Sequence, residues 1–527
     1  MCRSLAIALL VSLVLRGDIA AQILDETMVP RGQLRLQAHP SFTTWDSRFG
    51  RTLDGTKQRE DLGSDLTDPT GASLFPGIAA LVQALEGITS STGYSPVLGS
   101  VQGRVTQNVT RINFGGHLGV FDWLTIGVVV PWIQTRTALD QAFTPDTIGG
   151  ADLGLSPTRT NGTAVDGYLL AVSSAASAGE ANASAVCGGG PSAACTAAQA
   201  LANRATGLLR SAERAYEASP YFPMTGSAMA TSLAEISSTL DADLLSAGLT
   251  GIGVPMAFAT DGLTAESFGL LPVTTGAGID GAPLGSRRGL WQTGDIEVSA
   301  LIRLLERVPM NPAGKATGLS YRLTAGFVAR LPTGTPEDPD VFLDVGTGDG
   351  QMDLEGRTTA AIVLRRFGLE AGGWYGVQRS TMLTKRVAPL ELAMPPISTR
   401  QLVRWSPASY LGLEVAPSVR LTDELSFTAQ YRFFRKGRDV YELVDPAMPL
   451  DVNELARETG VKLHQIGAGL RYTTVRKWAA GIAPKPVELH LRVIYTAAGS
   501  GGHTPVSTRI EAGIRLFRRF WGPRPNG

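Results

Sequence analysis

Residues 411–433 read LGLEVAPSVRLTDELSFTAQYRF, and this stretch decides the fold class of the chain. After the central turn Thr422-Asp423-Glu424, apolar side chains occupy every second position from Leu425 to Phe433. The positions between them are polar, namely Ser426, Thr428, Gln430 and Arg432. Side chains of a strand point alternately to its two faces, so the stretch predicts a β-hairpin with one apolar and one polar face.

The same alternation recurs on both sides of this hairpin. A second clear hairpin turns at Phe121-Asp122-Trp123. Strands are predicted at 34–42, in the two arms of 105–132, and at 296–304, 319–327, 354–364, 369–377, 411–421, 425–433, 464–474, 487–495 and 508–516. Each is about 9 to 13 residues long, the length that a tilted strand needs to cross a bilayer. The pattern predicts an all-β fold, a transmembrane antiparallel β-barrel of about 12 strands (10–14), with a partly helical, Ala-rich loop insert.

Two observations favour a membrane barrel over a soluble sandwich or barrel. The links between predicted strands alternate between short turns, such as Arg366-Phe367-Gly368, and longer loops, such as 332–351 and 436–462, as in outer-membrane barrels. The polar faces also carry many Arg and Glu residues, whereas the opposite faces are aliphatic and aromatic. A soluble barrel needs an apolar interior, but a membrane barrel needs an apolar exterior because lipid is its solvent.

The ends of the chain and its long loops complete the domain organisation. Residues 1–21 read as a secretory signal peptide, with Arg3, an apolar run from Leu5 to Leu15, and a small-residue cleavage site at Ala20-Ala21. We expect residues 22–137 to form the first three barrel strands with a long first loop. Residues 138–290 are expected to form an extracellular insert or a plug, 291–520 the remaining barrel strands, and 521–527 a tail.

The insert has its own composition, dominated by Ala, Gly, Ser and Thr. Helical spacing of apolar residues predicts helices at 197–217 and 228–249, and a third short helix is predicted at 74–85. The sequence leaves open whether these helices cap the barrel or enter its lumen. Cys187 and Cys195 are the only cysteines after the predicted cleavage site, and in an exported protein they predict a local disulfide.

Composition excludes several classes of protein. The 527 residues carry 47 Lys and Arg against 47 Asp and Glu, so no net charge favours nucleic acid, and we expect no nucleic-acid partner. No apolar run after the N-terminus is long enough for a membrane-spanning helix. The expected location is the bacterial outer membrane, with outer-membrane lipid and a small-molecule solute as partners. Assembly as a homo-oligomer stays open.

Several segments resemble the outer-membrane protein family named for the meta-pathway of phenol degradation. The turn around Asp122 followed by a strand that ends at Pro131 is similar to hairpins of that family. Thr293-Gly294-Asp295 resembles its Gly-Asp strand entry, Leu331-Pro332-Thr333-Gly334 its strand exit, and Gly348-Asp349 a second entry. The resemblance covers residues 105–135 and 290–520, and it implies a channel or transporter for small, often aromatic compounds. It supplies no catalytic residue, and the Ala-rich insert departs from its pattern.

The charged residues on the polar faces are the candidates for lining a pore. They are Arg111, His117, Glu297, Arg303, Arg322, Glu414, Arg420, Arg432, Arg471, Glu488, Arg492, Arg509, Glu511 and Arg515. Opposing Arg and Glu rows shape the field of a pore and orient polar or anionic solutes. In the alternative reading, these groups only neutralise one another across a narrow lumen. We expect Arg420 and Arg432, on adjacent strands, to line the pathway.

Other chemistry has weaker signals. Six carboxylates between Glu337 and Asp353 lie in a Gly-rich loop, which is compatible with calcium, although the spacing is not that of an EF-hand and acidic surface loops are common. No nucleophile motif stands near the histidines, and no phosphate-binding loop or zinc-ligand cluster appears. We therefore expect no enzyme activity, no cofactor and no metal site.

Two hypotheses of different classes follow. In the first, the protein is an outer-membrane channel for passive uptake of small solutes, including aromatic or amphipathic ones. In the second, the barrel anchors a surface protein whose external helical insert binds a partner, with no transport. The polar lumen faces favour the channel, whereas the size of the insert favours the anchor.

Overall fold

The computed structural model describes most of the chain. The described residues are 28–50, 59–66, 68–69, 76–90, 92–144, 152–273, 278–309, 318–389, 392, 394–479, 482–483, 485–501 and 504–521. The predicted signal peptide and residues 522–527 of the predicted tail lie outside them.

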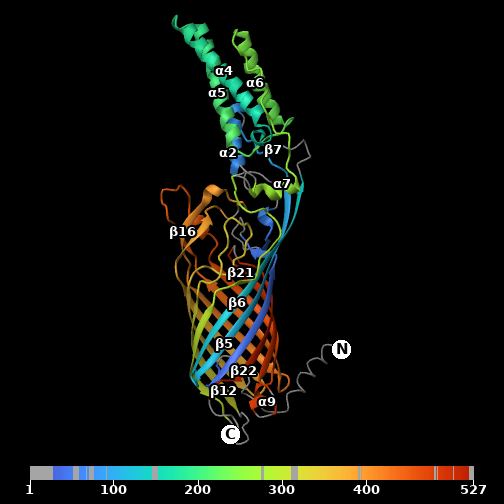
Figure 1. Cartoon of the computed structure of the whole chain (residues 1–527), viewed down its shortest axis with the longest axis vertical. Helices are drawn as coiled ribbons and strands as arrows, with labels where there is room; N and C mark the ends of the chain where they lie inside the picture. Colours follow the sequence, from blue (N-terminus) through green and yellow to red (C-terminus); the bar gives the residue numbers. More distant parts are fainter. Residues whose placement is uncertain are drawn as a thin grey trace.

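Twelve antiparallel strands form one closed barrel, which confirms the predicted fold class (Figure 1). The wall closes because β1 pairs with both β22 and β5, and β5 pairs with β6. In wall order the strands are β1 (Gln33–Trp45), β5 (Ser100–Phe121), β6 (Leu124–Thr144), β11 (Glu297–Arg307), β12 (Leu319–Arg330), β13 (Asp353–Leu364), β14 (Phe367–Gln378), β17 (Tyr410–Arg420), β18 (Leu425–Lys436), β20 (Val461–Thr473), β21 (Val487–Ser500) and β22 (Thr508–Arg519).

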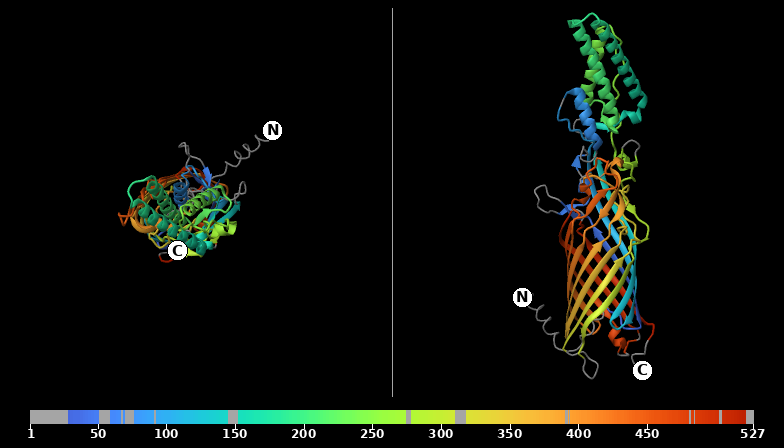
Figure 2. Two further views of the ribbon diagram at one scale, coloured as in Figure 1. Left: turned by 90° about the horizontal axis from the view of Figure 1, so that it is seen from above. Right: turned by 90° about the vertical axis from the view of Figure 1, so that its left-hand side faces the viewer.

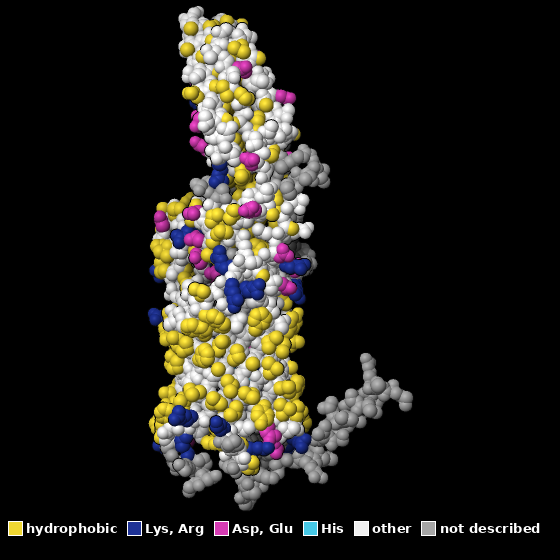
Figure 3. Space-filling model, turned by 45° about the vertical axis from the view of Figure 1, so that its right-hand side comes forward, with side chains coloured by type: hydrophobic (Ala, Val, Ile, Leu, Met, Phe, Trp, Pro, Cys, Tyr) yellow, Lys and Arg dark blue, Asp and Glu magenta, His cyan; other side chains and the backbone are white. Residues whose placement is uncertain are grey.

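The exterior of the barrel carries an apolar belt. Large apolar side chains such as Leu36, Phe114 and Ile466 are 46%, 52% and 50% exposed. Water-soluble proteins rarely expose so many large apolar side chains on one surface. Figure 3 shows a band of hydrophobic side chains across the visible face of the lower barrel, with charged side chains above and below it. This surface suits a hydrocarbon environment, and the closed wall leaves no strand edge exposed to lipid. None of the described helices is both long and apolar enough to cross a membrane.

Short turns join the strands at one end of the barrel. β5 turns into β6 between Phe121 and Leu124, and β13 turns into β14 between Leu364 and Phe367. The link from β20 to β21 includes α9 (Val475–Ala479) at the same end. In outer-membrane barrels the end with short turns is periplasmic, so the long loops and helices lie on the extracellular side.

β5 and β6 are longer than expected and continue beyond the other strands as a two-stranded ribbon. The expected barrel portion ended at residue 137, but β6 runs to Thr144. Its upper part also pairs with β9 (Arg287–Arg288) and β10 (Gln292–Thr293), which return from the insert. The ribbon carries the insert away from the mouth of the barrel.

Smaller elements surround the extracellular mouth. In the first loop, β2 (Ser47–Phe49) pairs with β3 (Arg59–Asp61). They are followed by η1 (Ser64–Leu66) and β4 (Asp68–Pro69), which pairs with β5. On another part of the rim, β15 (Thr381–Arg386), β16 (Arg400–Ser406) and β19 (Val440–Leu443) form a three-stranded sheet. The rim sheet is accompanied by η3 (Ile397–Thr399) and α8 (Asn453–Ala456).

A helical domain stands above the mouth, clear of the lumen (Figures 1 and 2). Its elements are α2 (Pro76–Thr89), β7 (Leu153–Leu155), α3 (Pro157–Thr160), α4 (Gly162–Cys187), α5 (Ala193–Ala218), β8 (Tyr221–Pro223), α6 (Ala228–Ser246), α7 (Ala265–Leu270) and η2 (Leu271–Val273). Three helical segments were expected, and α2, α5 and α6 lie at those places. No helix was predicted at α4. Its inner face consists largely of Ala and Gly, so the periodic spacing of apolar residues is weak there.

The apolar core of the molecule lies in this domain and in its junction with β5. Tyr168, Phe222 and Leu233 are fully buried, and Val101 and Val105 of β5 belong to the same cluster. Burial raises the pKa of Tyr168, so its hydroxyl stays protonated, and it lies 3.0 Å from Ser237 Oγ. The helical domain therefore has an apolar core of its own, whereas the interior of the barrel is polar.

Candidate functional site

The polar faces of the strands line the lumen. The predicted residues alternate with the exposed apolar side chains of the belt, which places Arg111, His117, Glu297, Arg303, Arg322, Glu414, Arg420, Arg432, Arg471, Glu488, Arg492, Arg509, Glu511 and Arg515 on the inner face. The structure brings most of them into a few ion-paired groups.

The upper group lies toward the extracellular mouth and centres on Arg330. Its guanidinium contacts Glu297 at 2.9 Å, Glu355 at 3.2 Å and Asp353 at 3.6 Å. Arg357 is a second partner of Glu355. Arg330, Glu355 and Arg357 were not among the predicted residues, although strict alternation from Ala361 back to Asp353 places Glu355 and Arg357 on the inner face.

Three rings form an aromatic shelf beside this group, defined by Trp374, Tyr410 and Phe434 on the adjacent strands β14, β17 and β18. The Tyr410 hydroxyl donates to Glu355 Oε2 at 2.9 Å and accepts from Arg330 at 2.6 Å. The Arg432 guanidinium stacks on Trp374, 4.7 Å from the ring centre, and pairs with Glu414 at 3.6 Å. The sequence prediction missed the shelf because it treated aromatic residues as marks of the outer face.

A strongly cationic wall formed by β20, β21 and β22 extends from the lower part of the lumen up to the level of Arg432. Glu488 is shared by Arg471 at 2.6 Å and Arg515 at 3.3 Å. Glu511 is shared by Arg509 at 3.0 Å and Arg492 at 3.7 Å. The ring of His490 on this wall meets the ring of His39 on the neighbouring strand β1 edge to face, with centroids 4.9 Å apart. Each carboxylate thus serves two guanidiniums, and this leaves an excess of positive charge.

Other predicted residues lie nearer the periplasmic end. Arg303 and Arg322 share Glu306, close to the turn between β11 and β12. Arg420 is buried at the end of β17, and one of its guanidinium nitrogens donates to the Arg365 carbonyl at 3.5 Å. His117 is also buried near this end. Arg111, by contrast, lies toward the extracellular mouth near Glu297 and Arg330, and it faces the lumen with no ion pair within 4.0 Å among the described residues.

The first described residues lie against the inner wall at this end. Val29 is 1% exposed, and its backbone N–H donates to Thr125 Oγ1 at 3.0 Å. The Thr125 hydroxyl in turn lies 3.4 Å from the Val29 carbonyl oxygen. Gly119 leaves room for the Pro30 carbonyl, which would lie 2.1 Å from a Cβ at that position.

Two cavities follow one another down the lumen. The upper cavity has a volume of about 200 Å³ and is lined by Arg330, Glu355, Arg357 and Trp374, among others. The lower cavity has a volume of about 90 Å³ and is lined by Arg471, His490, Arg492 and Arg515, with Ser418, Ser426, Thr428 and Gln430. Both are lined by Glu370, Glu414 and Ala416, so the two spaces adjoin at that level.

A third cavity lies outside the lumen and is called the vestibule pocket. It has a volume of about 420 Å³ between the loop at 336–349 and the rim sheet, and its lining includes Trp405, Tyr441 and Lys436. The rings of Trp405 and Tyr441 stack with centroids 6.3 Å apart, and Lys436 Nζ lies 5.6 Å from the Trp405 ring centre. Lys436 is the register partner of Tyr410, so the pocket adjoins the top of the aromatic shelf.

The acidic loop uses its carboxylates as partners of cations. Asp340 contacts Arg386 at 2.9 Å and Arg400 at 3.0 Å, and Glu337 contacts Lys385 at 3.2 Å. Within the described part of the chain, no three His, Cys, Asp or Glu side chains are placed to hold a metal ion.

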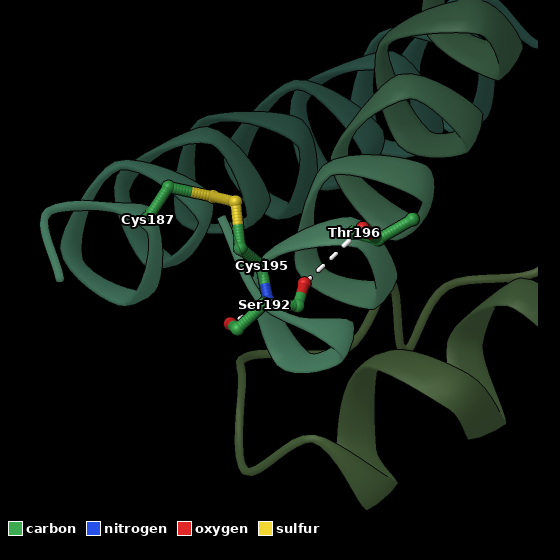
Figure 4. The surroundings of a disulfide bond; sticks show 4 residues. All are labelled: Cys187, Ser192, Cys195 and Thr196. Atoms are coloured by element: carbon green, nitrogen blue, oxygen red, sulfur yellow. Dashed lines mark hydrogen bonds between the residues drawn. A yellow bond between two sulfur atoms is a disulfide. The ribbon is translucent and has the colours of Figure 1, made fainter. Parts of the chain in front are cut away.

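A disulfide joins Cys187 at the end of α4 to Cys195 near the start of α5 (Figure 4). Ser192 caps α5, because its hydroxyl accepts the Cys195 N–H at 3.1 Å. The Thr196 hydroxyl donates to the Ser192 carbonyl oxygen at 3.1 Å. The bond closes the turn between α4 and α5, and this turn lies at the end of the helical domain that points away from the barrel (Figure 1).

A closed barrel with an apolar belt and a charged interior defines a transmembrane β-barrel of the bacterial outer membrane. No protein-family model and no curated protein matches the sequence.

Solved structures similar to this chain include three outer-membrane proteins. An outer membrane channel from Pseudomonas putida has 9% identity and a TM-score of 0.42, over 94% of this chain and 98% of the other. The CymD monoaromatic hydrocarbon channel has 9% identity and a TM-score of 0.25, over 96% and 94%. The Ralstonia pickettii toluene transporter TbuX has 8% identity and a TM-score of 0.26, over 94% and 90%.

Proposed function

We propose that the protein is an outer-membrane channel for the passive uptake of small solutes, including aromatic or amphipathic ones. The observation that carries this proposal is the succession of adjoining cavities along one lumen. A structural barrel without transport has no need for such space, since small barrels are otherwise filled by interior side chains. The lining mixes charged groups with the Trp374 ring, a combination that suits solutes with both polar and apolar parts.

The vestibule pocket supports the amphipathic part of the proposal. Its walls combine Leu383, Leu455 and Val461 with the stacked pair Trp405 and Tyr441. The charge of Lys436 is balanced by Asp439 at 2.9 Å, and Trp405 Nε1 also donates to Asp439 at 3.1 Å. A solute that enters here meets apolar surface first and reaches the Tyr410 ring next, before the charged lumen. This order agrees with the function implied by the resemblance to the phenol meta-pathway family.

The proposal is tested by reconstitution. Purified protein in planar bilayers is expected to give discrete conductance steps, and liposomes that contain it are expected to swell in small solutes but not in large sugars. Arg432→Ala removes the guanidinium that lines the upper cavity and stacks on Trp374, so single-channel conductance and ion selectivity should both change. A correctly folded barrel that passes no current and no solute would contradict the channel.

A surface-anchor function is the second candidate, and the position of the helical domain favours it. The domain projects beyond the rim, and Leu170 and Leu245 on its helices are 70% and 58% exposed. In this case the folded barrel would be impermeable, and deletion of the helices would abolish partner binding without any effect on permeability.

A further inference from the structure

The lower cavity has an uneven charge distribution. Arg471, His490, Arg492 and Arg515 line it on the side of β20, β21 and β22. The opposite side carries Glu370 and Glu414, and hydroxyl and amide groups of β17 and β18 lie between them. Charges of one sign gathered on one wall produce a field across the lumen, which a solute feels strongly where water is scarce.

The carboxylates on the cationic wall do not neutralise it. Glu488 is only 3% exposed and has two guanidinium partners, Arg471 and Arg515. Glu511 likewise has Arg492 and Arg509. Each group therefore carries one more cation than anion.

The wall formed by β14 and β17 offsets only part of this excess. Glu414 faces the Arg432 guanidinium at 3.6 Å, so its charge is already balanced within the upper cavity. Glu370 adds one carboxylate to the lining, against one surplus guanidinium in each of the two groups. A solute with a positive group would have to compete with Arg432 for the Glu414 carboxylate. A solute with a negative group finds arginines whose charge exceeds that of their carboxylate partners. The balance of the lower cavity thus favours an anion over a zwitterion or a cation.

We propose that the lower cavity is a binding site for a small organic anion, whose carboxylate is held by Arg471, Arg492 and Arg515. The apolar body of the anion lies toward the level of Glu370 and Ala416, where the upper cavity with Trp374 begins. This inference rests on the proposed channel function and names the solute class that the channel takes. Bidentate guanidinium–carboxylate contacts supply the affinity, and the serine, threonine and glutamine side chains supply further hydrogen bonds.

The experiment uses benzoate as the probe and measures its block of single-channel current in planar bilayers. Arg515→Gln removes one guanidinium of the cavity and leaves Glu488 paired with Arg471, so that no buried carboxylate is stranded. We expect benzoate to block the wild-type channel, and the variant to need about tenfold more benzoate, the loss typical of one charge-assisted hydrogen bond. Reversal potentials in a KCl gradient should show chloride preferred over potassium.

Arg322→Gln is the matched control variant. Arg322 also shares one carboxylate, Glu306, with a second arginine, but it does not line the lower cavity. Its benzoate block should equal that of the wild type.

Other probes decide the class of ligand. Benzyl alcohol, benzylamine, phenylalanine and inorganic phosphate should block poorly compared with benzoate. The proposal is overturned if benzyl alcohol or phenylalanine blocks as well as benzoate, if phosphate blocks better, or if the two arginine variants behave alike. In each of these cases current still flows, so the channel function itself stands.

A direct binding measurement covers the remaining case. If the folded protein passes no current, the channel proposal fails, and saturation-transfer NMR with benzoate and detergent-solubilised protein then tests the site alone. Binding that is lost in Arg515→Gln and kept in Arg322→Gln supports the site. No binding to the wild type overturns it.

Discussion

Two glycines make space for the aromatic shelf. A Cβ at Gly412 would lie 2.0 Å from Trp374 Cε2, and a Cβ at Gly376 would lie 2.1 Å from Tyr410 Cζ. Each ring therefore lies over a glycine of the neighbouring strand, where any other residue would displace it. The rings in turn fix Arg432 and Glu355, which contact them. The shape of the upper lumen thus depends on two residues that carry no side chain.

Gly412→Ala tests this dependence. The added methyl forces the Trp374 ring out of its place, and we expect a loss of about 1 to 3 kcal/mol of stability together with altered conductance. The measurement is the temperature at which the folded barrel band disappears in heat-modifiability gels, combined with single-channel recording. Gly356→Ala is the control, since no atom lies within 4 Å of a Cβ there. Equal behaviour of the two variants would mean that Trp374 is not held against Gly412.

Alternation predicted the inner face well but could not predict its pairings. Side chains alternate between the two faces of a strand, so the neighbours of a residue show which face it lies on. Glu414 and Arg432 could therefore be placed on the inner face from the sequence. Their contact depends on the register between β17 and β18, which only the folded sheet fixes. Arg330 ends its strand, and its three carboxylate partners come from two other strands. Trp374 lies an even number of positions from Glu370 and therefore on the same face of β14. The alternation that identified the charged residues could also have identified Trp374.

The helical hairpin formed by α4 and α5 illustrates the limit of periodicity. On α5, the positions of Leu208 and Ala212 give a clear apolar face, and the helix was predicted. On α4, Ala175, Ala176 and Gly179 face inward, while alanines and serines also face outward. Burial of small residues allows close packing but leaves little contrast between faces. The Asn161 cap, whose side chain accepts the Ala164 N–H, was the local signal for this helix.

The disulfide closes this hairpin across a separation of 8 residues. The double substitution Cys187→Ser with Cys195→Ser should destabilise the hairpin by about 2 to 3 kcal/mol, since the unfolded segment regains its freedom. Thermal melting followed at the helical circular-dichroism band should shift downward, while the heat-modifiability of the barrel stays unchanged. A coincident shift of both would show that the helical domain and the barrel unfold as one unit.

The separation between helical domain and lumen leads to a prediction for the whole molecule. The core residues Ala176 and Ala205 lie on facing parts of α4 and α5, so a short Gly/Ser linker between them can replace residues 177–204 without removing the main core. We expect conductance and solute permeation to remain as in the full chain, because the deleted tip points away from the mouth. A large rise in conductance would mean that the helices restrict entry. Loss of binding to a surface partner would instead support the anchor function.

The length of β5 and β6 has a mechanical consequence. Strands of 22 and 21 residues span about 70 Å, of which the apolar belt accounts for only about 25 Å. Both strands leave the barrel at the same end, so a pull on the helical domain runs along their axes. Their hydrogen bonds to β1 and β11 lie across that direction and are loaded in shear, so many must yield together. The ribbon therefore acts as a tether that transmits tension from the cell exterior into the wall of the barrel.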